Sequence, residues 1–426
     1  MGPSQIFNQE LSVSCDNLSL YRGEMTLVPH QGDVCFGTGT IDLACGGVIR
    51  HLRVAFERTD GEVLPDLLRS TDGKYGRGTS MMRLPLSDDF FVFVTSGAKQ
   101  RALVGESDLI MGGSEQDCTA LSLYLLNGLI PGHDMNWILG DWRISSTRTA
   151  CAYDLTRLSR PSREINLTHR LTVTRQDQQP FRWSQVESIV RRFLTFLSSG
   201  NCSRISAPVI YGHGDETIKY FRFETPPRSL PTNRRSLATD ISQNDLNDAL
   251  SLFLKATEGT FRASILDRAI EWQILAERVM YDSLEQALFT VQMLLEMLSF
   301  VMLVEDAAIL GEDGYGKLPA SDRITLLCGH SSQRVSLDLS QFNGLDVFCA
   351  ANCINNVGEL ITALRNKLIH PTKKNREYLD RVPQNVRFAA IYSGLQISSL
   401  AMLKSIDYKG SYFDIIDHES RVVPWA

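Results

Sequence analysis

Leu284–Val304 reads LEQALFTVQMLLEMLSFVMLV and is the most apolar stretch of the 426-residue chain. A helix of about 20 apolar residues is long enough to cross a lipid bilayer. However, this stretch carries Glu285, Gln292 and Glu296, and a charged side chain near the bilayer midplane is costly. We therefore expect a buried helix in the core of a helical domain, and no membrane partner.

The pattern around this stretch is helical from residue 244 onwards, because apolar residues recur at the spacing of a helix packed on a core. Helices are predicted over residues 244–257, 262–280, 282–305, 321–328, 353–370 and 384–404. Residues 311–317, GEDGYGK, resemble a phosphate-binding loop, but Leu318 follows where that motif needs Ser or Thr. We expect an inter-helix loop there instead.

The first half of the chain has the two-residue alternation that is typical of strands. Leu11–Cys15, Ile165–Val173 and Ile218–Phe223 alternate, and Phe90–Val94 is a short apolar run. One helix interrupts them, and its predicted start at Ser184–Glu187, SQVE, fits a capping box. This half is expected to be a β-rich domain of the sandwich or barrel type.

A domain boundary is expected where neither pattern holds. Residues 225–240, TPPRSLPTNRRSLATD, contain three prolines and no apolar periodicity. We therefore divide the chain into a β-rich N-terminal domain (1–225), a linker (226–243) and an α-helical domain (244–426). The predicted fold class is α+β.

Charge is distributed unevenly along the chain, whose net charge is −6. Residues 1–142 hold 18 acids against 10 bases, whereas residues 143–192 hold 10 arginines against 4 acids and residues 365–387 hold 7 bases against 2 acids. Basic islands on an acidic chain suit a local phosphate-binding site, although charge runs are also common on solvated faces. The nine cysteines contain no CxxC, and the N-terminus lacks the regions of a signal peptide, so a cytoplasmic location is expected.

The second island begins with Leu364–Pro371, LRNKLIHP. The residue before a proline avoids helical geometry, so the helix is predicted to end near His370. Arg365 can grip a phosphate through two parallel hydrogen bonds, and a histidine can move protons near neutral pH. Five residues on a helix correspond to a rotation of about 140°. The two side chains are therefore expected to flank a phosphate rather than touch each other.

Similar pairs of Arg and His occur at Arg163–His169, Arg323–His330 and Arg365–His370. The first pair falls at and in an alternating strand of the β-rich half, and the second spans the end of a short helix and a loop. Only Arg365–His370 is predicted to lie on a long amphipathic helix within a helical array, and this context selects it.

Leu364–Pro371 looks very like the active-site helix of HEPN ribonucleases, especially of ApeA-like abortive-infection proteins. Leu288–Ser299 is similar to their long apolar helix, and Asp322–Leu327 resembles their short connecting helix. The β-rich half resembles the N-terminal part of ApeA-like proteins. The resemblance of the helical half covers roughly 160 of the 426 residues. It implies a metal-independent endoribonuclease that dimerises through its HEPN domain and acts in anti-phage defence or toxin-like growth arrest.

The resemblance also implies roles for individual residues. Arg365, His370 and Asn366 would be catalytic toward RNA, with no cofactor and no metal. Four basic residues are expected either to bind RNA or merely to be solvated loop residues: Lys367, Lys373, Lys374 and Arg376. Glu296 and Gln292 either support the wall of the site or form a solvent edge, together with Ser299.

Alternatives from other classes stay open. The helical domain could be a catalytically silent HEPN scaffold that binds RNA, a nucleotide or a protein partner, or it could accompany a nucleotidylyl transferase. The presence of Arg365, Asn366 and His370 favours the active enzyme, because a silent scaffold has no need of all three. The N-terminal domain would sense a phage-derived trigger or a nucleotide, or hold the nuclease inactive.

Overall fold

The computed structural model divides the chain into two compact units. Unit 1 comprises residues 1–191 and 205–233, and unit 2 comprises residues 192–204 and 234–426. The residues that the structure describes are 17–28, 35–44, 52–58, 79–83, 91–95, 103–104, 109–112, 117–126, 134–149, 167–201, 203–214, 217–224, 242–331, 342, 344–370 and 372–426. The predicted strand Leu11–Cys15, the predicted linker (226–243) up to residue 241, Arg163 and Pro371 lie outside them.

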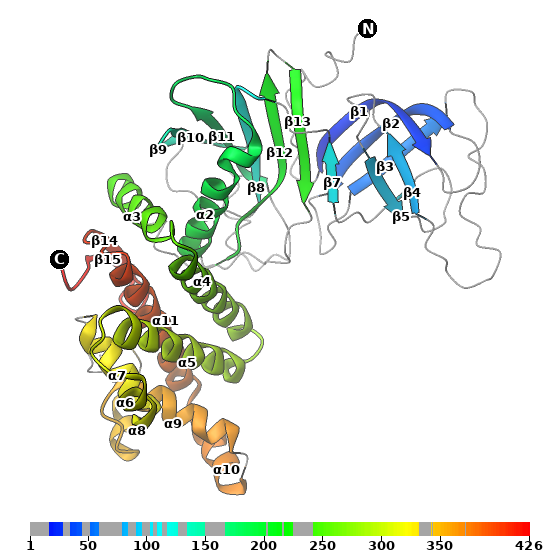
Figure 1. Ribbon diagram of the computed structural model, residues 1–426. Coiled ribbons are helices and arrows are strands. Elements are labelled where there is room, and N and C mark those ends of the chain that lie inside the picture. The colour runs from blue at the N-terminus through cyan, green and yellow to red at the C-terminus, as the bar shows by residue number, and fades with distance from the viewer. Residues whose placement is uncertain are drawn as a thin grey trace. The chain divides into compact units, whose positions relative to one another are not determined.

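The described strands of unit 1 form an antiparallel sheet in the order β6-β3-β2-β1-β4-β5-β7-β13-β12-β8-β11-β10-β9 (Figure 1). Their bounds are β1 (Asn17–Val28), β2 (Cys35–Ala44), β3 (Leu52–Arg58), β4 (Thr79–Arg83), β5 (Phe91–Thr95), β6 (Leu103–Val104), β7 (Leu109–Gly112), β8 (Ala120–Leu126), β9 (Asp134–Leu139), β10 (Trp142–Arg148), β11 (Leu167–Arg175), β12 (Ser206–Gly214) and β13 (Thr217–Glu224). Three predicted strands are confirmed as β5, β11 and β13. No described pairing joins β6 to β9, so these strands are not closed into the barrel that was one expectation.

Helix α2 (Trp183–Asn201) has the predicted apolar stripe, with Val186 and Val190 at most 1% exposed. The predicted capping box is wrong, because the helix begins one residue before Ser184. The Gln185 side chain accepts a hydrogen bond of 2.8 Å from the Arg182 backbone N–H instead. Residues 192–204, which we had placed in the β-rich domain, group with the helical unit.

The described part of unit 2 is mostly helical, as predicted. Its elements are α3 (Gln243–Ala256), α4 (Thr260–Met280), α5 (Leu284–Phe300), the π-helical η3 (Val301–Asp306), α6 (Glu312–Lys317), α7 (Ala320–His330), α8 (Leu345–Ala351), α9 (Val357–Ile369), α10 (Lys373–Arg381), α11 (Gln384–Ser405), β14 (Ser411–Asp414) and β15 (Glu419–Val422). All six predicted helices are confirmed, as α3, α4, α5 with η3, α7, α9 and α11. With a β-sheet unit and a helical unit, the fold class is α+β.

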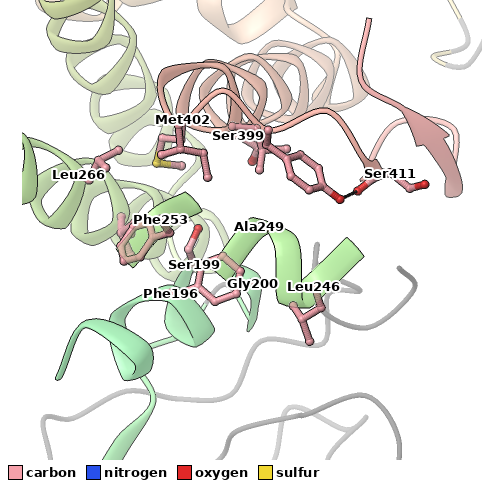
Figure 2. Close-up of a pocket in the computed structure, with 14 residues that line it drawn as sticks. Phe196, Ser199, Gly200, Leu246, Ala249, Phe253, Leu266, Ser399, Met402 and Ser411 are labelled. Carbon is pink, nitrogen blue, oxygen red and sulfur yellow. Dashed lines mark hydrogen bonds between the residues drawn. The ribbon is translucent and has the colours of Figure 1, made fainter. Parts of the chain in front are cut away.

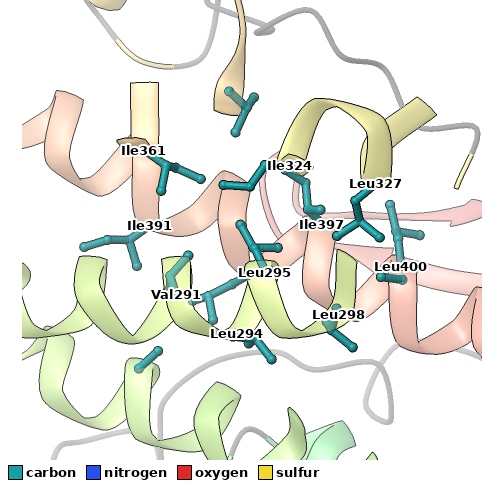
Figure 3. Packing of buried hydrophobic residues seen from close by; sticks show 14 of the residues in the cluster. Val291, Leu294, Leu295, Leu298, Ile324, Leu327, Ile361, Ile391, Ile397 and Leu400 are labelled. Atoms are coloured by element: carbon teal, nitrogen blue, oxygen red, sulfur yellow. The ribbon is translucent and has the colours of Figure 1, made fainter. Parts of the chain in front are cut away.

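Helix α5 lies at the centre of the helical core, as its apolar sequence predicts. It packs against α4, α7, α9 and α11. Figure 3 shows Val291, Leu295 and Leu298 of α5 among Ile361 of α9 and Ile391 of α11. These five side chains are at most 2% exposed, so each contributes roughly 1.5–3 kcal/mol by leaving water.

Among the residues that the structure describes, two segments, Leu284–Asp306 and Gln384–Ser405, are long and apolar enough to cross a membrane. In their most apolar windows, 56% and 78% of the residues are buried inside the structure. Core helices of water-soluble proteins have the same length and composition, so these properties alone assign no membrane span.

Three local expectations in the helical half are wrong. The GEDGYGK segment forms α6, with Tyr315 buried, rather than a loop. The helix predicted to begin at residue 353 begins at Val357, because Cys353 has a positive φ of 54° and Asn356 caps the helix. Helices α8 and α10 and the β14–β15 hairpin had not been predicted.

Candidate functional site

The predicted motif lies at the C-terminal end of α9, whose start and buried face follow from its sequence. The Asn356 side-chain oxygen caps the helix by accepting a 2.8 Å hydrogen bond from the Glu359 backbone N–H. Leu360, Ile361 and Leu364 are at most 1% exposed, and α9 packs against α5, α7 and α11. These contacts hold the last turn of α9, and with it the motif, in place.

Arg365 is half-buried on this last turn. Its guanidinium carbon lies 5.6 Å from the centre of the Phe289 ring on α5, where the face of the ring attracts the cation. One guanidinium N–H donates a 3.3 Å hydrogen bond to Oδ1 of the exposed Asn366. Within the described ranges, no carboxylate lies at ion-pairing distance from Arg365. The guanidinium therefore keeps N–H donors for an external anion.

His370 is exposed and ends α9, with φ −110° and ψ 80°. Its backbone carbonyl accepts hydrogen bonds of 2.7 Å from the Thr372 backbone N–H and of 2.7 Å from Nδ2 of Asn375. Its imidazole makes no hydrogen bond to a described residue. The backbone is thus held in place while the ring is available to a ligand. Thr372 also caps α10, a helix-start signal that the sequence interpretation missed.

The two motif side chains do not hydrogen-bond to each other among the described residues, and no ring contact joins them. Arg365 lies over α5, whereas His370 has left the helix. This separation is compatible with a phosphate between them. Phe289, which positions Arg365, is a residue that sequence reasoning did not select, since nothing local links positions so far apart in the chain.

The basic residues around the motif have different environments. Nζ of Lys367 lies 5.3 Å from the centre of the Tyr378 ring, so this lysine is partly engaged within the protein. Lys373 makes a 3.9 Å ion pair with a carboxylate one turn along α10. Lys374 and Arg376 are exposed on the same helix. The start of α10, directly after His370, therefore presents positive charge to solvent.

Glu296 and Gln292 belong to a different polar cluster. Nε2 of Gln292 donates a 2.7 Å hydrogen bond to Glu296, and Arg323 makes a 3.3 Å ion pair with the other carboxylate oxygen. The hydroxyl oxygens of Ser299 and Tyr315 lie 2.5 Å apart and share a hydrogen bond. Burial raises the pKa of the Tyr315 hydroxyl. The solvent-edge interpretation is wrong for Gln292 and Ser299, which are at most 2% exposed. No described hydrogen bond links this cluster to the motif on α9.

The two competing Arg–His pairs are poorly placed for external ligands. Arg323 donates hydrogen bonds of 3.0 Å to the Leu318 carbonyl and 3.2 Å to the Gly316 carbonyl, which ties α7 to α6. Its guanidinium also lies 4.6 Å above the Tyr315 ring. In unit 1, His169 is 1% exposed on β11. These engagements favour Arg365 and His370 as the accessible pair.

The cysteines and acidic residues do not form a metal centre where the structure describes them. Cys349 is buried on α8, and Cys353 is exposed beyond the end of that helix. Across the described ranges, no group of three or more His, Cys, Asp or Glu side chains is placed to hold a metal ion.

A narrow apolar crevice lies elsewhere in unit 2. Phe253 of α3, Leu266 of α4 and Met402 of α11 line it, together with the last turns of α2 (Figure 2). Its volume of about 40 Å³ leaves room for a few water molecules. The hydroxyl of Ser399 is already engaged by Gln273 at 2.9 Å. This space is a packing gap rather than a site for a nucleotide.

The geometry thus defines a helical unit with an accessible Arg–Asn–His group at one helix end. Residues 260–423, from α4 to β15, match the family model described as the YopA C-terminal domain. The chain is also similar to the SPbeta prophage-derived uncharacterized protein YopA of Bacillus subtilis (strain 168), with 23% identity over 265 residues. The alignment covers 61% of this chain and 58% of that protein's length. No solved structure matches the chain.

Proposed function

We propose that this protein is a metal-independent endoribonuclease of the HEPN type that cleaves RNA in the cytoplasm as part of anti-phage defence. The observation that carries the proposal is the environment of the Arg365 and His370 side chains. Arg365 is held over Phe289 without a described carboxylate partner, and His370 is exposed at the end of the same helix. The prophage origin of the B. subtilis relative supports the phage-related setting.

The reaction uses a nucleophile that RNA itself supplies. The ribose 2′-oxygen forms a bond to the adjacent phosphorus while the bond from phosphorus to the 5′-oxygen breaks. His370 takes the 2′-hydroxyl proton, and a proton is returned to the leaving 5′-oxygen. Arg365 stabilises the charge on the phosphoryl oxygens, and Asn366 orients the guanidinium through its 3.3 Å hydrogen bond.

One Arg–His pair per chain makes a small site, so we also propose a homodimer in which two motifs face each other. Met293 supports this arrangement. It is 51% exposed on α5, one helical turn beyond Phe289, which lies beneath Arg365. We propose that the dimer interface covers this side chain, which removes its apolar surface from water.

Purified protein incubated with total RNA tests the proposal. We expect cleavage that survives EDTA, leaves 2′,3′-cyclic phosphate ends and spares both DNA and 2′-O-methyl RNA. Arg365→Ala and His370→Ala should abolish it, with stability changed by no more than about 1 kcal/mol. His330→Ala is the matched control, because it removes the histidine of a competing pair. Full activity in His370→Ala, or 3′-hydroxyl ends formed only with Mg²⁺ or Mn²⁺, would contradict the mechanism.

A catalytically silent scaffold that binds RNA, a nucleotide or a protein partner is the second candidate. The exposed positive charge of Lys374 and Arg376 at the start of α10 favours its RNA-binding form. Tight RNA binding by wild-type protein, without any cleavage, would establish it. A phage-derived trigger or a nucleotide bound by the β-rich unit is proposed as the regulator under either candidate.

A further inference from the structure

A groove of about 610 Å³ opens at the turn between α4 and α5, facing the start of α11. This volume falls within the usual range for small-molecule sites, about 300–1,000 Å³. Tyr281, at the end of α4, lines the groove and is 62% exposed. Phe388 and Tyr392 line it from α11, one helical turn apart, with ring centres 6.0 Å from each other. Aromatic rings thus line the groove from the α4–α5 turn and from α11.

The same groove has a fixed polar group in its lining. Arg387 donates a 2.5 Å hydrogen bond to a Glu285 carboxylate oxygen and another of 2.5 Å to the Leu379 carbonyl. The Ser283 hydroxyl donates a 3.3 Å hydrogen bond to the second oxygen of Glu285. Nε of Arg387 is buried without a partner among the described residues. Donors and acceptors therefore lie beside flat aromatic surfaces.

The position of the groove relates it to the motif on α9. Glu285 and Phe289 are four residues apart on α5, so they share a face and are separated by a rise of about 6 Å. Arg387 contacts Glu285, and Arg365 lies over Phe289. Two arginines are thereby placed along one face of α5, one beside the groove and one in the motif.

We infer that this groove binds one unstacked nucleobase of the RNA, adjacent to the phosphate held at the motif; the inference rests on the proposed function. A nucleobase has flat faces that stack on aromatic rings, and its edges carry donors and acceptors. The rings of Tyr281, Phe388 and Tyr392 match the faces, and the pair of Glu285 with Arg387 matches an edge. A purely apolar occupant would bury that charged pair without offering it a partner.

The test measures binding of a 2′-O-methyl RNA oligonucleotide by fluorescence anisotropy. Tyr281→Ala is expected to weaken binding by about 5- to 150-fold, the usual effect of removing one stacking ring. Tyr281→Phe should restore it, because the ring returns. Phe261→Ala is the matched control, since Phe261 is 61% exposed at the opposite end of α4, outside the groove. With cleavable RNA, Tyr281→Ala should raise KM with little effect on kcat.

A second measurement identifies the contact directly. An oligonucleotide containing 5-iodouridine is photocrosslinked to wild-type protein, and the attached peptide is sequenced by mass spectrometry. Crosslinks to Tyr281, Phe388 or Tyr392 support the groove. If RNA is cleaved but Tyr281→Ala binds as Phe261→Ala does, or if crosslinks fall elsewhere, the groove assignment is overturned and the nuclease stands. Crosslinks in the groove without any cleavage would contradict the proposed nuclease activity but support the groove as a nucleobase-binding site. Wild-type protein that neither binds nor cleaves RNA overturns both.

Discussion

Gly394 on α11 lies where this helix crosses α5, and replacing it with alanine tests the packing of the helical core. A Cβ added there would lie 2.2 Å from Cγ1 of Val291 and 3.3 Å from Cδ1 of Ile361. Carbon atoms in contact prefer about 3.5–4.0 Å. The helices would have to separate by roughly 1 Å or more, because the χ1 angle of a valine in a helix is nearly fixed.

The expected cost follows from two opposing effects. Overpacking a core typically destabilises a protein by about 1–3 kcal/mol. The greater helix propensity of alanine over glycine offsets about 1 kcal/mol of that. Gly394→Ala should therefore lower the free energy of unfolding by up to about 2 kcal/mol. Gly329→Ala on α7 is the matched control, because its added Cβ meets nothing within 4 Å and should leave stability unchanged or slightly raised.

Urea denaturation followed by the helical circular dichroism signal measures both variants. Combining Gly394→Ala with Val291→Ala gives the new methyl group the space that the valine vacates. The double variant should be more stable than the sum of the single effects predicts, by at least about 1 kcal/mol. Additive effects, to within about 0.5 kcal/mol, would show that the two positions are not in contact and would refute the reasoning.

Three further predictions concern other parts of the helical unit. Arg323→Ala removes hydrogen bonds to the carbonyls of Gly316 on α6 and of Leu318 just after it, and also the partner of Glu296. The free energy of unfolding measured in urea should fall by about 2–4 kcal/mol; a loss under about 0.5 kcal/mol would argue against a structural role. Burial raises the thiol pKa of Cys328 to about 12, so this thiol stays protonated and unreactive below that pH. The exposed Cys353 should alkylate in native protein and Cys328 only in denaturant, as peptide mass spectrometry can check; equal native labelling would contradict this. Light scattering should report about twice the 47.7 kDa chain mass, and Met293→Glu should halve it, whereas a wild-type monomer active on RNA would exclude the dimer.

Much of the helical unit could be predicted from sequence, because helix formation is governed by local patterns. The apolar spacing in 282–305 and 384–404 predicts α5 and α11 to within a few residues. Leu364 and Pro371 bracket a helix end near His370, and α9 does end there. The HEPN resemblance and the catalytic roles of Arg365 and His370 stay predictions, since a sequence pattern does not show chemistry.

Tertiary structure alone decided which polar residues face solvent and which face other helices. Gln292 and Glu296 form a regular stripe in the sequence, and nothing local reveals that α6 and α7 cover it. Arg323 and Arg365 are each followed by a histidine at a similar spacing. Arg323 nevertheless donates a hydrogen bond to a carbonyl of α6, whereas Arg365 lies over the Phe289 ring and is only half-buried.

The groove illustrates the same limit most clearly. Its two sides come from residues 280–285 and 382–392, about a hundred positions apart in the chain. Neither segment carries a recognisable motif, since aromatic residues at helical spacing are common in cores. Only the packing of α11 against α5 brings the two segments together. The burial of apolar faces drives this packing, and because that force is non-directional, the sequence alone does not show which helix faces will meet. The sequence by itself therefore determined where the helices and the Arg–His motif lie, while the fold determined what surrounds them.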